Sequence, residues 1–385
     1  MQCFYFSGVE TSVLGVNGMQ LFISRCDVKH LFGSLFGVLL LLFVLLMASP
    51  SARAQGCVAA HSEPQSDDIL LSNAYHDGGA PGGHEWLHRL TLNIDWRTFS
   101  SNEYFIGTHE IYRPAGHRVE NHQNIYDVGI NYQLTPRWSI VADVPVFQGT
   151  RDQVYPPSGV FSVAGIGDMT VGAQTWIFRP PTESGGNIAF SASLKIPTGI
   201  DNATGAATLN GKTVIATADP SLQPGDGGWG FLLASQAYKR IWFHTMTYFQ
   251  GEWLFNPEDT NGVPSFRTQP GQAVDSVPDQ YLFRGGFGHS VPKVRGLELS
   301  FGARLEGVPV RDAFGSSDGF RRPGYIISID PGLMYSVWHE VISVNGPWAV
   351  QRDRRPSVPE MQYNIANGDA FFADYTIIVG ISHYF

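Results

Sequence analysis

Four short stretches of the 385-residue sequence contain residue types that enzymes use for catalysis or phosphate binding. Gly315–Gly319 (GSSDG) fits the G-x-S-x-G pattern of serine hydrolases, but that pattern acts at a strand-to-helix turn, and here it lies in a predicted loop. Gly205–Thr213 (GAATLNGKT) is one residue too long for a phosphate loop and has no predicted helix after it. His289 and Ser290 are adjacent, so on a strand their side chains point to opposite faces. An outer-membrane esterase or phospholipase is therefore an alternative and not the main prediction.

Metal-site patterns are equally weak. His84 and His88 are four residues apart, a spacing that suits a metal on a helix, but GGHEWLHR leads into a predicted strand. No cysteine or carboxylate cluster at ligand spacing accompanies them. The formal net charge of −9 argues against nucleic acid as a partner. We predict no catalytic residue, no metal and no cofactor.

The elements that would position any functional residue are predicted to be β-strands. The sequence is rich in Gly and aromatic residues, with 15% charged residues, and apolar and polar residues alternate from residue 86 onward. Such alternation is typical of strands with two different faces. It predicts about twelve strands, at residues 86–97, 125–134, 138–147, 168–178, 188–196, 229–238, 242–254, 281–289, 297–306, 325–335, 340–349 and 374–385.

The connections between these strands alternate between short and long. The long ones, at about 98–124, 148–165, 198–228, 256–280, 307–324 and 350–373, are unusual in a compact soluble domain. They are expected in an all-β transmembrane antiparallel barrel, which has short periplasmic turns and long extracellular loops. Aromatic residues near the short turns fit interfacial girdles: Trp138, Trp176, Phe178, Trp242, Phe243, Trp338 and Phe385. A soluble β-sandwich or lectin is the alternative fold.

The final residues, Tyr375–Phe385 (YTIIVGISHYF), alternate to the carboxyl terminus. A barrel needs its last strand to pair with its first, because hydrocarbon tolerates no unpaired sheet edge. The ending also resembles the C-terminal signal of outer-membrane barrels, which predicts the barrel-assembly machinery as a partner through Phe385.

Three segments are predicted along the chain. Residues 1–54 contain an apolar stretch after basic residues and before Ala52-Arg53-Ala54, which predicts a signal peptide cut before Gln55, with Met19 as a second candidate start. An uncleaved anchor helix is the alternative. Residues 55–85 are predicted to form an N-terminal periplasmic, plug-like segment, and residues 86–385 the barrel. The predicted location is the outer membrane of a Gram-negative bacterium, with outer-membrane lipid and lipopolysaccharide as surroundings.

Charged residues on the polar strand faces are candidates to line the barrel interior, where side chains tune selectivity. They are Arg89, Asp95, Arg97, Asp127, Asp143, Asp168, Lys195, Arg284, Glu298, Arg304 and Glu306. Alternatively, these charges pair across neighbouring strands and fill a narrow interior. The longest loop, residues 199–228, is predicted to be a plain surface loop, with an inward-folded constriction as the alternative.

Three motifs in the middle of the chain resemble a known family. GIGDMTVGAQ (Gly165–Gln174), SLKIPTG (Ser193–Gly199) and DPSLQPGDGGWGFLLASQAYKR (Asp219–Arg240) resemble the outer-membrane family named for the meta-pathway of phenol degradation. With the terminal HYF, the resemblance covers about residues 125–385. It implies an outer-membrane β-barrel associated with the passage of small molecules.

The predicted function is a channel or transporter that lets small hydrophobic or aromatic solutes cross the outer membrane passively. A barrel that does not transport, and instead binds a partner or serves as a scaffold, is the second hypothesis.

Overall fold

The computed structural model describes residues 89–112, 118–178, 185–365 and 370–385. The predicted signal peptide, the 55–85 segment, His84 and His88 lie outside these residues, so what the sequence indicates for them stays a prediction. Nearly all of the described secondary structure is β-strand, as the alternating pattern indicates.

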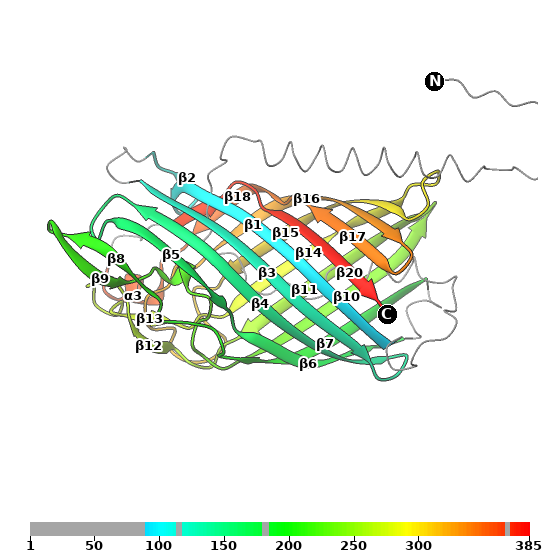
Figure 1. Ribbon diagram of the computed structural model, residues 1–385, viewed down its shortest axis with the longest axis horizontal. Coiled ribbons are helices and arrows are strands. Elements are labelled where there is room, and N and C mark those ends of the chain that lie inside the picture. The colour runs from blue at the N-terminus through cyan, green and yellow to red at the C-terminus, as the bar shows by residue number, and fades with distance from the viewer. Residues whose placement is uncertain (1–88, 113–117, 179–184, 366–369) are drawn as a thin grey trace, which may run out of the picture. The chain divides into compact units, whose positions relative to one another are not determined.

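Twelve strands form a closed antiparallel barrel, and four further strands extend it (Figure 1). The predicted fold class is therefore confirmed. Around the wall, the barrel strands follow chain order, as expected for consecutive antiparallel hairpins. They are β1 (Leu90–Ile106), β3 (Val119–Gln133), β4 (Trp138–Gln153), β6 (Met169–Trp176), β7 (Gly186–Ile196), β10 (Gly230–Trp242), β11 (Thr245–Phe255), β14 (Gln280–Ser290), β15 (Leu297–Val308), β16 (Gly324–Val337), β17 (Glu340–Asn345) and β20 (Ile377–Tyr384).

The barrel is closed by pairing between its first and last strands. The register runs from Thr91 opposite Tyr384 to Thr98 opposite Ile377. Each of the twelve barrel strands is thereby paired on both sides, which is the condition for β-structure in hydrocarbon. The predicted role of the C-terminal strand in closure is confirmed.

The four extending strands continue or flank the barrel wall. They are β2 (His109–Glu110), β5 (Gly159–Ile166), β18 (Trp348–Arg354) and β19 (Ala370–Ala373). Two separate hairpins lie between barrel strands: β8 (Thr204–Leu209) with β9 (Lys212–Thr217), and β12 (Thr260–Pro264) with β13 (Val274–Ser276).

Within the part of the chain that the structure describes, helical structure is confined to short pieces such as η4 (Pro220–Leu222) and α3 (Val358–Gln362). No helix among the described residues is long and apolar enough to cross a membrane.

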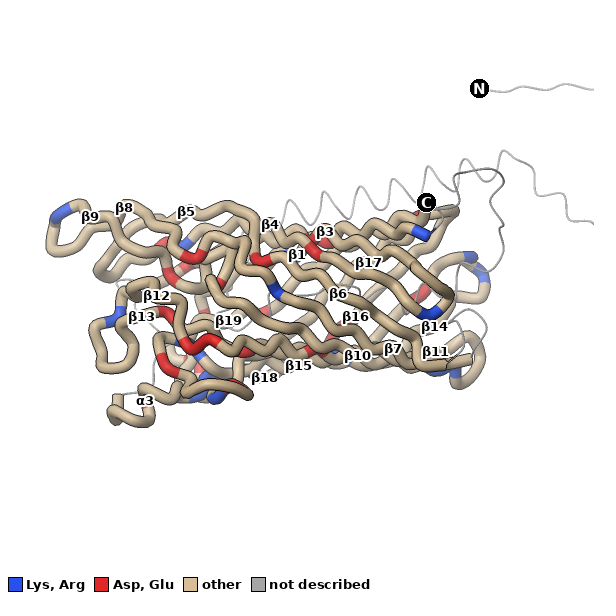
Figure 2. The backbone as a smooth tube through the Cα atoms, turned by 90° about the horizontal axis from the view of Figure 1, so that it is seen from below, with Lys and Arg blue, Asp and Glu red and all other residues tan. Residues whose placement is uncertain are grey.

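The two ends of the barrel differ. At the end near the C-terminus, which we call the turn end, short connections such as Leu134–Arg137 and Phe243–His244 join the strands. The opposite end, the loop end, holds β8, β9, β12, β13 and α3 (Figure 1). Acidic and basic residues lie close together among the segments of the loop end (Figure 2).

The two faces of the wall have opposite chemistry. Residues opposite each other in register share a face, so the pairing assigns each side chain to the outside or the inside. Large apolar side chains on the outside are exposed, including Leu194, Leu233, Phe249, Phe301 and Ile381. An outer face with many exposed large apolar side chains is typical of a lipid-facing barrel and would be a liability in water.

Two predicted loops are largely strand, which corrects the predicted strand ends. Strands β1 and β3 continue through 98–106 and 119–124, and β4 and β5 occupy most of 148–165. The alternation is lost there because the outer face also becomes polar: Ser100 and His122 are paired in register, with Oγ 2.8 Å from Nδ1. Strands that extend beyond the apolar band therefore resemble loops in sequence.

One aromatic residue that was predicted to lie in an interfacial girdle lies inside the barrel instead. Trp176 is opposite the fully buried Ala189 and packs edge-on against Tyr238, with ring centroids 6.1 Å apart. It therefore belongs to an interior cluster near the turn end. In contrast, Trp242 and Trp338 are exposed, as an interfacial position requires.

Close packing of strands explains one pair of glycines and gives a test of the wall. Gly286 is opposite Gly302, and a Cβ atom on Gly286 would lie 2.4 Å from the carbonyl oxygen of Phe301. We expect Gly286→Ala to lower the free energy of unfolding by about 1–3 kcal/mol, because the backbone must shift. Gly346→Ala is the control, since nothing lies within 4 Å of its added Cβ. Urea titrations in detergent measure both variants, and equal stability would contradict the predicted crowding.

Candidate functional site

The barrel interior contains apolar clusters but also holds most of the charged residues singled out in the sequence. Arg97 on β1 is 2% exposed and interacts electrostatically with Asp127 on β3 and Asp143 on β4. Register places Asp95 opposite Asp127 on the same inner face. These four residues form one charged group across three neighbouring strands.

A second charged group lies across the barrel on β14, β15 and β16. Arg284 forms an ion pair with Asp330, with Nε and Oδ2 3.2 Å apart. Arg304 does the same with Glu306 at 3.1 Å, and Glu298 interacts with Arg240. Pairing of mixed charges is thus a real feature of the interior. Arg89, in contrast, is exposed at the start of β1, where its guanidinium lies 3.4 Å from the carbonyl oxygen of Leu134.

Asp168 and Lys195, the candidates within the family motifs, meet in a junction that joins three chain segments. The carboxylate of Asp168 accepts hydrogen bonds from the backbone amides of Gly199 and Asp226, each at 2.9 Å. Lys195 Nζ lies 3.9 Å from Asp168 Oδ2 and donates a shorter hydrogen bond to Asp226. Asp226 was not predicted as a candidate, yet it is the closer partner of Lys195.

Part of the long 199–228 connection folds into the barrel, so the prediction of a plain surface loop is wrong for residues 218–226, which we call the inner segment. The tip of the β8–β9 hairpin is exposed, whereas Ala218, Asp219 and Leu222 are almost fully buried. Leu222 belongs to a core cluster with Phe147 of the wall, and Gln123 Nε2 donates to the carbonyl oxygen of Ser221 at 2.8 Å. The apolar side chain and the amide together attach the inner segment to β3 and β4.

A buried carboxylate anchors the inner segment. Asp219 accepts two hydrogen bonds from Arg322, at 2.8 and 2.7 Å, and its Oδ2 lies 3.4 Å from Arg151 Nη2. Burial alone would raise the pKa of Asp219, but the two guanidinium groups hold that pKa well below its ordinary value. Asp219 is therefore charged at all ordinary pH values and links β4, the inner segment and the β15–β16 loop.

Two adjoining cavities lie around the inner segment. The outer one, of about 100 Å³, is lined by loop residues including Ser221, Asp275 and Arg322. The inner one, of about 40 Å³, is lined by β3, β4, β6, β7, β10, β11, β14 and the inner segment and has a mainly apolar wall with Ile125 and Leu232. Both cavities are lined by Asp226 and Gln280. The two cavities therefore adjoin at these residues; we call the line from the outer cavity to the inner one the route, and it is narrow.

Several residues around this route were missed by the sequence reasoning. Arg151, Asp219, Asp275, Arg321 and Arg322 all lie in segments where the strand alternation fails. Asp219 had one usable signal: Asp followed by Pro marks a helix start, and Asp219 does cap η4. Nothing local in the sequence indicates that Arg151 and Arg322, far apart along the chain, meet at that carboxylate.

The enzyme-like motifs are used structurally. Ser317 of GSSDG is buried, and its Oγ accepts a hydrogen bond from the backbone amide of Asp312 at 2.8 Å. His289 points outward, with Nδ1 2.9 Å from Thr245 Oγ1, while Ser290 is on the inner face opposite Glu298. Among the described residues, no three His, Cys, Asp or Glu side chains are placed to hold a metal ion.

Comparison with solved structures shows the fold. An outer membrane channel from Pseudomonas putida F1 superposes with a TM-score of 0.52 at 12% identity, covering 77% of this chain and 95% of that chain. The β-domain of the Bordetella autotransporter BrkA gives 0.43 at 13% identity, covering 76% and 100%. The toluene transporter TodX of P. putida gives 0.40 at 9% identity, covering 83% and 93%.

No family model and no curated protein matches the sequence. At 12% identity, the likeness to the P. putida F1 channel shows a shared outer-membrane barrel fold. The resemblance to the meta-pathway family stays a prediction.

Proposed function

We propose that this protein is a barrel of the Gram-negative outer membrane that lets small hydrophobic or aromatic solutes pass down their gradient. The observation that supports the proposal is the pair of cavities that share Asp226 and Gln280 in their walls, one among the loop-end segments and one between the barrel strands. The inner cavity has a mainly apolar wall, which favours apolar solutes over ions. The apolar outer face supports the proposed location in a lipid bilayer.

Single-channel recording in planar bilayers is the test of a solute path. We expect brief or small conductance steps, because the inner segment narrows the route and the charged residues predicted to line the interior are largely paired. A one-ring aromatic solute added to the bath should reduce the conductance by occupying the same route. A correctly folded barrel that stays electrically silent under all conditions would contradict the proposal.

The second candidate is a barrel that does not conduct. The ion pairs Arg284–Asp330 and Arg304–Glu306 favour it, because paired charges fill space and hold neighbouring strands together. Arg284→Met separates the two hypotheses. If the Arg284–Asp330 pair is only structural, the variant should be less stable and its conductance should be unchanged. If Arg284 belongs to the route, the conductance of the folded variant should change.

We also infer membership of the meta-pathway family. Its three motifs are distant in sequence, yet Asp168, Lys195, Gly199 and Asp226 from those motifs meet in one junction. A cluster of this kind gives the motifs a common structural purpose, which supports the resemblance.

The proposed contact with the barrel-assembly machinery involves the last residue. Phe385 is partly exposed at the turn end, with its ring edge-on to His383 at 4.4 Å between centroids. We expect Phe385→Ser to reduce the amount of protein in the outer-membrane fraction of cells severalfold while leaving refolding in detergent unchanged. Trp338→Ser, which removes a 90% exposed aromatic ring at the same end, is the control. Equal losses for both variants would contradict a specific signal at Phe385.

A further inference from the structure

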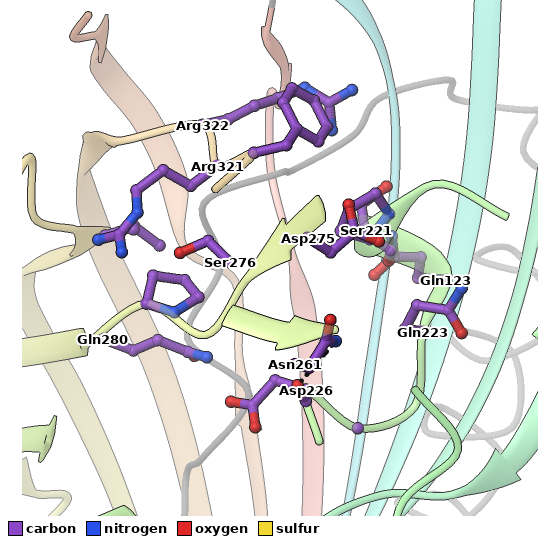
Figure 3. A pocket seen from close by; sticks show the side chains of 15 residues that line it. Gln123, Ser221, Gln223, Asp226, Asn261, Asp275, Ser276, Gln280, Arg321 and Arg322 are labelled. Atoms are coloured by element: carbon purple, nitrogen blue, oxygen red, sulfur yellow. Dashed lines mark hydrogen bonds between the residues drawn. The ribbon is translucent and has the colours of Figure 1, made fainter. Parts of the chain in front are cut away.

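The outer cavity contains one carboxylate that the protein does not satisfy. Asp275, in β13, is 2% exposed, and among the described residues neither of its carboxylate oxygens receives a hydrogen bond. Figure 3 shows Asp275 near Ser221 among the side chains that line the cavity. A buried carboxylate without a hydrogen-bond donor is costly, because it has lost the water that solvated it.

The other charged groups of the same cavity are all paired. Asp226 binds Lys195, Arg322 binds Asp219, and Arg321 binds Asp312 through two hydrogen bonds. Asp275 therefore differs from its neighbours: it lines the cavity, and its two carboxylate oxygens are buried with their hydrogen-bonding capacity unused.

The wall around Asp275 combines this acceptor with apolar surface. Val308, Phe320, Pro220 and Pro278 line the same cavity. Its volume of about 100 Å³ is somewhat below that of a dry engineered cavity of about 150 Å³ that takes up benzene. The site thus suits a compact molecule of about one ring that carries one polar group.

We propose that Asp275 is the recognition residue for small solutes with a hydroxyl group, accepting a hydrogen bond from that hydroxyl while the apolar wall holds the rest of the molecule. The inference rests on the proposed function and names its substrate class. A hydroxyl donor fits better than an ammonium group, because the cavity wall already balances the carboxylates of Asp226 and Asp275 with the guanidinium groups of Arg321 and Arg322. Hydrogen bonds to a charged acceptor in a buried site are stronger than neutral ones.

The protonation state of Asp275 gives the site a pH dependence. Burial, followed by repulsion from Asp219, raises the pKa of Asp275 to about 7, against the opposing effect of Arg322; Asp201 also raises it. A hydroxyl group forms a stronger hydrogen bond with the ionised carboxylate than with the protonated one. Solute binding therefore favours the ionised form of Asp275. The affinity should therefore rise as the pH increases through about 7 and level off above it. Asp226 and Arg321, which also line the cavity, are held by partners of opposite charge.

The test is isothermal titration calorimetry on the full-length protein in detergent with three matched probes. Benzyl alcohol carries the hydroxyl, ethylbenzene has a methyl group in its place, and benzylamine carries a cation. We expect benzyl alcohol to bind about tenfold or more tightly than ethylbenzene, the ratio that one hydrogen bond to a charged group provides. Asp275→Leu should abolish this preference, and Asp275→Asn should remove the pH dependence. Asp152→Asn, which changes a carboxylate on β4 away from the cavity, should leave both unchanged.

Three results would overturn the inference: no benzyl alcohol binding by the folded wild type, the same preference in Asp275→Leu, or tighter binding of benzylamine than of benzyl alcohol. Slower migration of heated than of unheated samples in gels verifies that each variant is folded. Binding and permeation fail separately. Permeation without Asp275-dependent binding would contradict this inference and leave the proposed function standing. Asp275-dependent binding without permeation would contradict the proposed function and leave the binding site standing.

Discussion

Asp219→Ala should increase the single-channel conductance of the barrel severalfold and lower its free energy of unfolding by about 3–5 kcal/mol. Asp219 is the shared partner of Arg151 and Arg322, and both guanidinium groups are almost fully buried. Without the carboxylate, two like charges face each other in a site with little water. We expect the inner segment to leave the barrel, because its release lets water reach both arginines.

Asp318→Ala is the matched control for this variant, since Asp318 is an exposed carboxylate at the same end of the barrel. It should retain wild-type conductance and stability. A folded Asp219→Ala protein with wild-type conductance would show that the inner segment does not limit the route. Planar-bilayer recording and urea titration together separate an opened barrel from one that has lost its structure.

The second large effect is expected at Lys195. Lys195→Met keeps most of the side-chain length but removes the charge that Asp168 and Asp226 share, leaving two carboxylates close together in a buried junction. We expect a loss of about 3–5 kcal/mol in the free energy of unfolding, the usual cost of breaking a buried ion pair from one side. Unfolding in urea, followed by tryptophan fluorescence, measures the change.

Lys239→Met is the control, because Lys239 is an exposed lysine on the neighbouring strand β10. Its removal should change stability by less than about 1 kcal/mol, as for most surface charges. If Lys195→Met is as stable as the control, the junction does not hold the inner segment in place. Partial rescue by the double variant Lys195→Met/Asp226→Asn would show that the unpaired carboxylate causes the loss.

The barrel was predictable from the sequence because its wall repeats one simple rule. Large apolar residues face outward and mostly small or polar residues face inward, as in the last strand, where Ile377, Val379 and Ile381 point outward while Gly380 and Ser382 point inward. The outer residues are selected by lipid, so the pattern is strong wherever a strand crosses the apolar band. The pattern fades in the outer parts of β1 and β3, where polar residues such as Ser100 and His122 replace the apolar ones on the outer face.

The interior of the loop end was much less predictable. The contacts of Asp219 with Arg151 and Arg322 join residues up to 103 positions apart, and no periodicity relates them. The P-G-D-G motif did mark Asp226 as part of a pattern, but only the folded chain shows that it faces Lys195. Asp275 has no sequence signal at all, because its significance comes from the hydrogen bonds that it lacks among the described residues.

Liposome swelling with the purified protein tests the central claim most directly, namely that the barrel provides a narrow passive route for small solutes. Vesicles with and without protein are compared in isotonic solutions of neutral and aromatic solutes of increasing size. We predict protein-dependent swelling that is fastest for compact, partly apolar solutes, falls with size, and becomes faster and less selective in Asp219→Ala. Swelling that equals the protein-free rate for every solute, in both the wild type and Asp219→Ala, would contradict the claim and leave a barrel that does not transport.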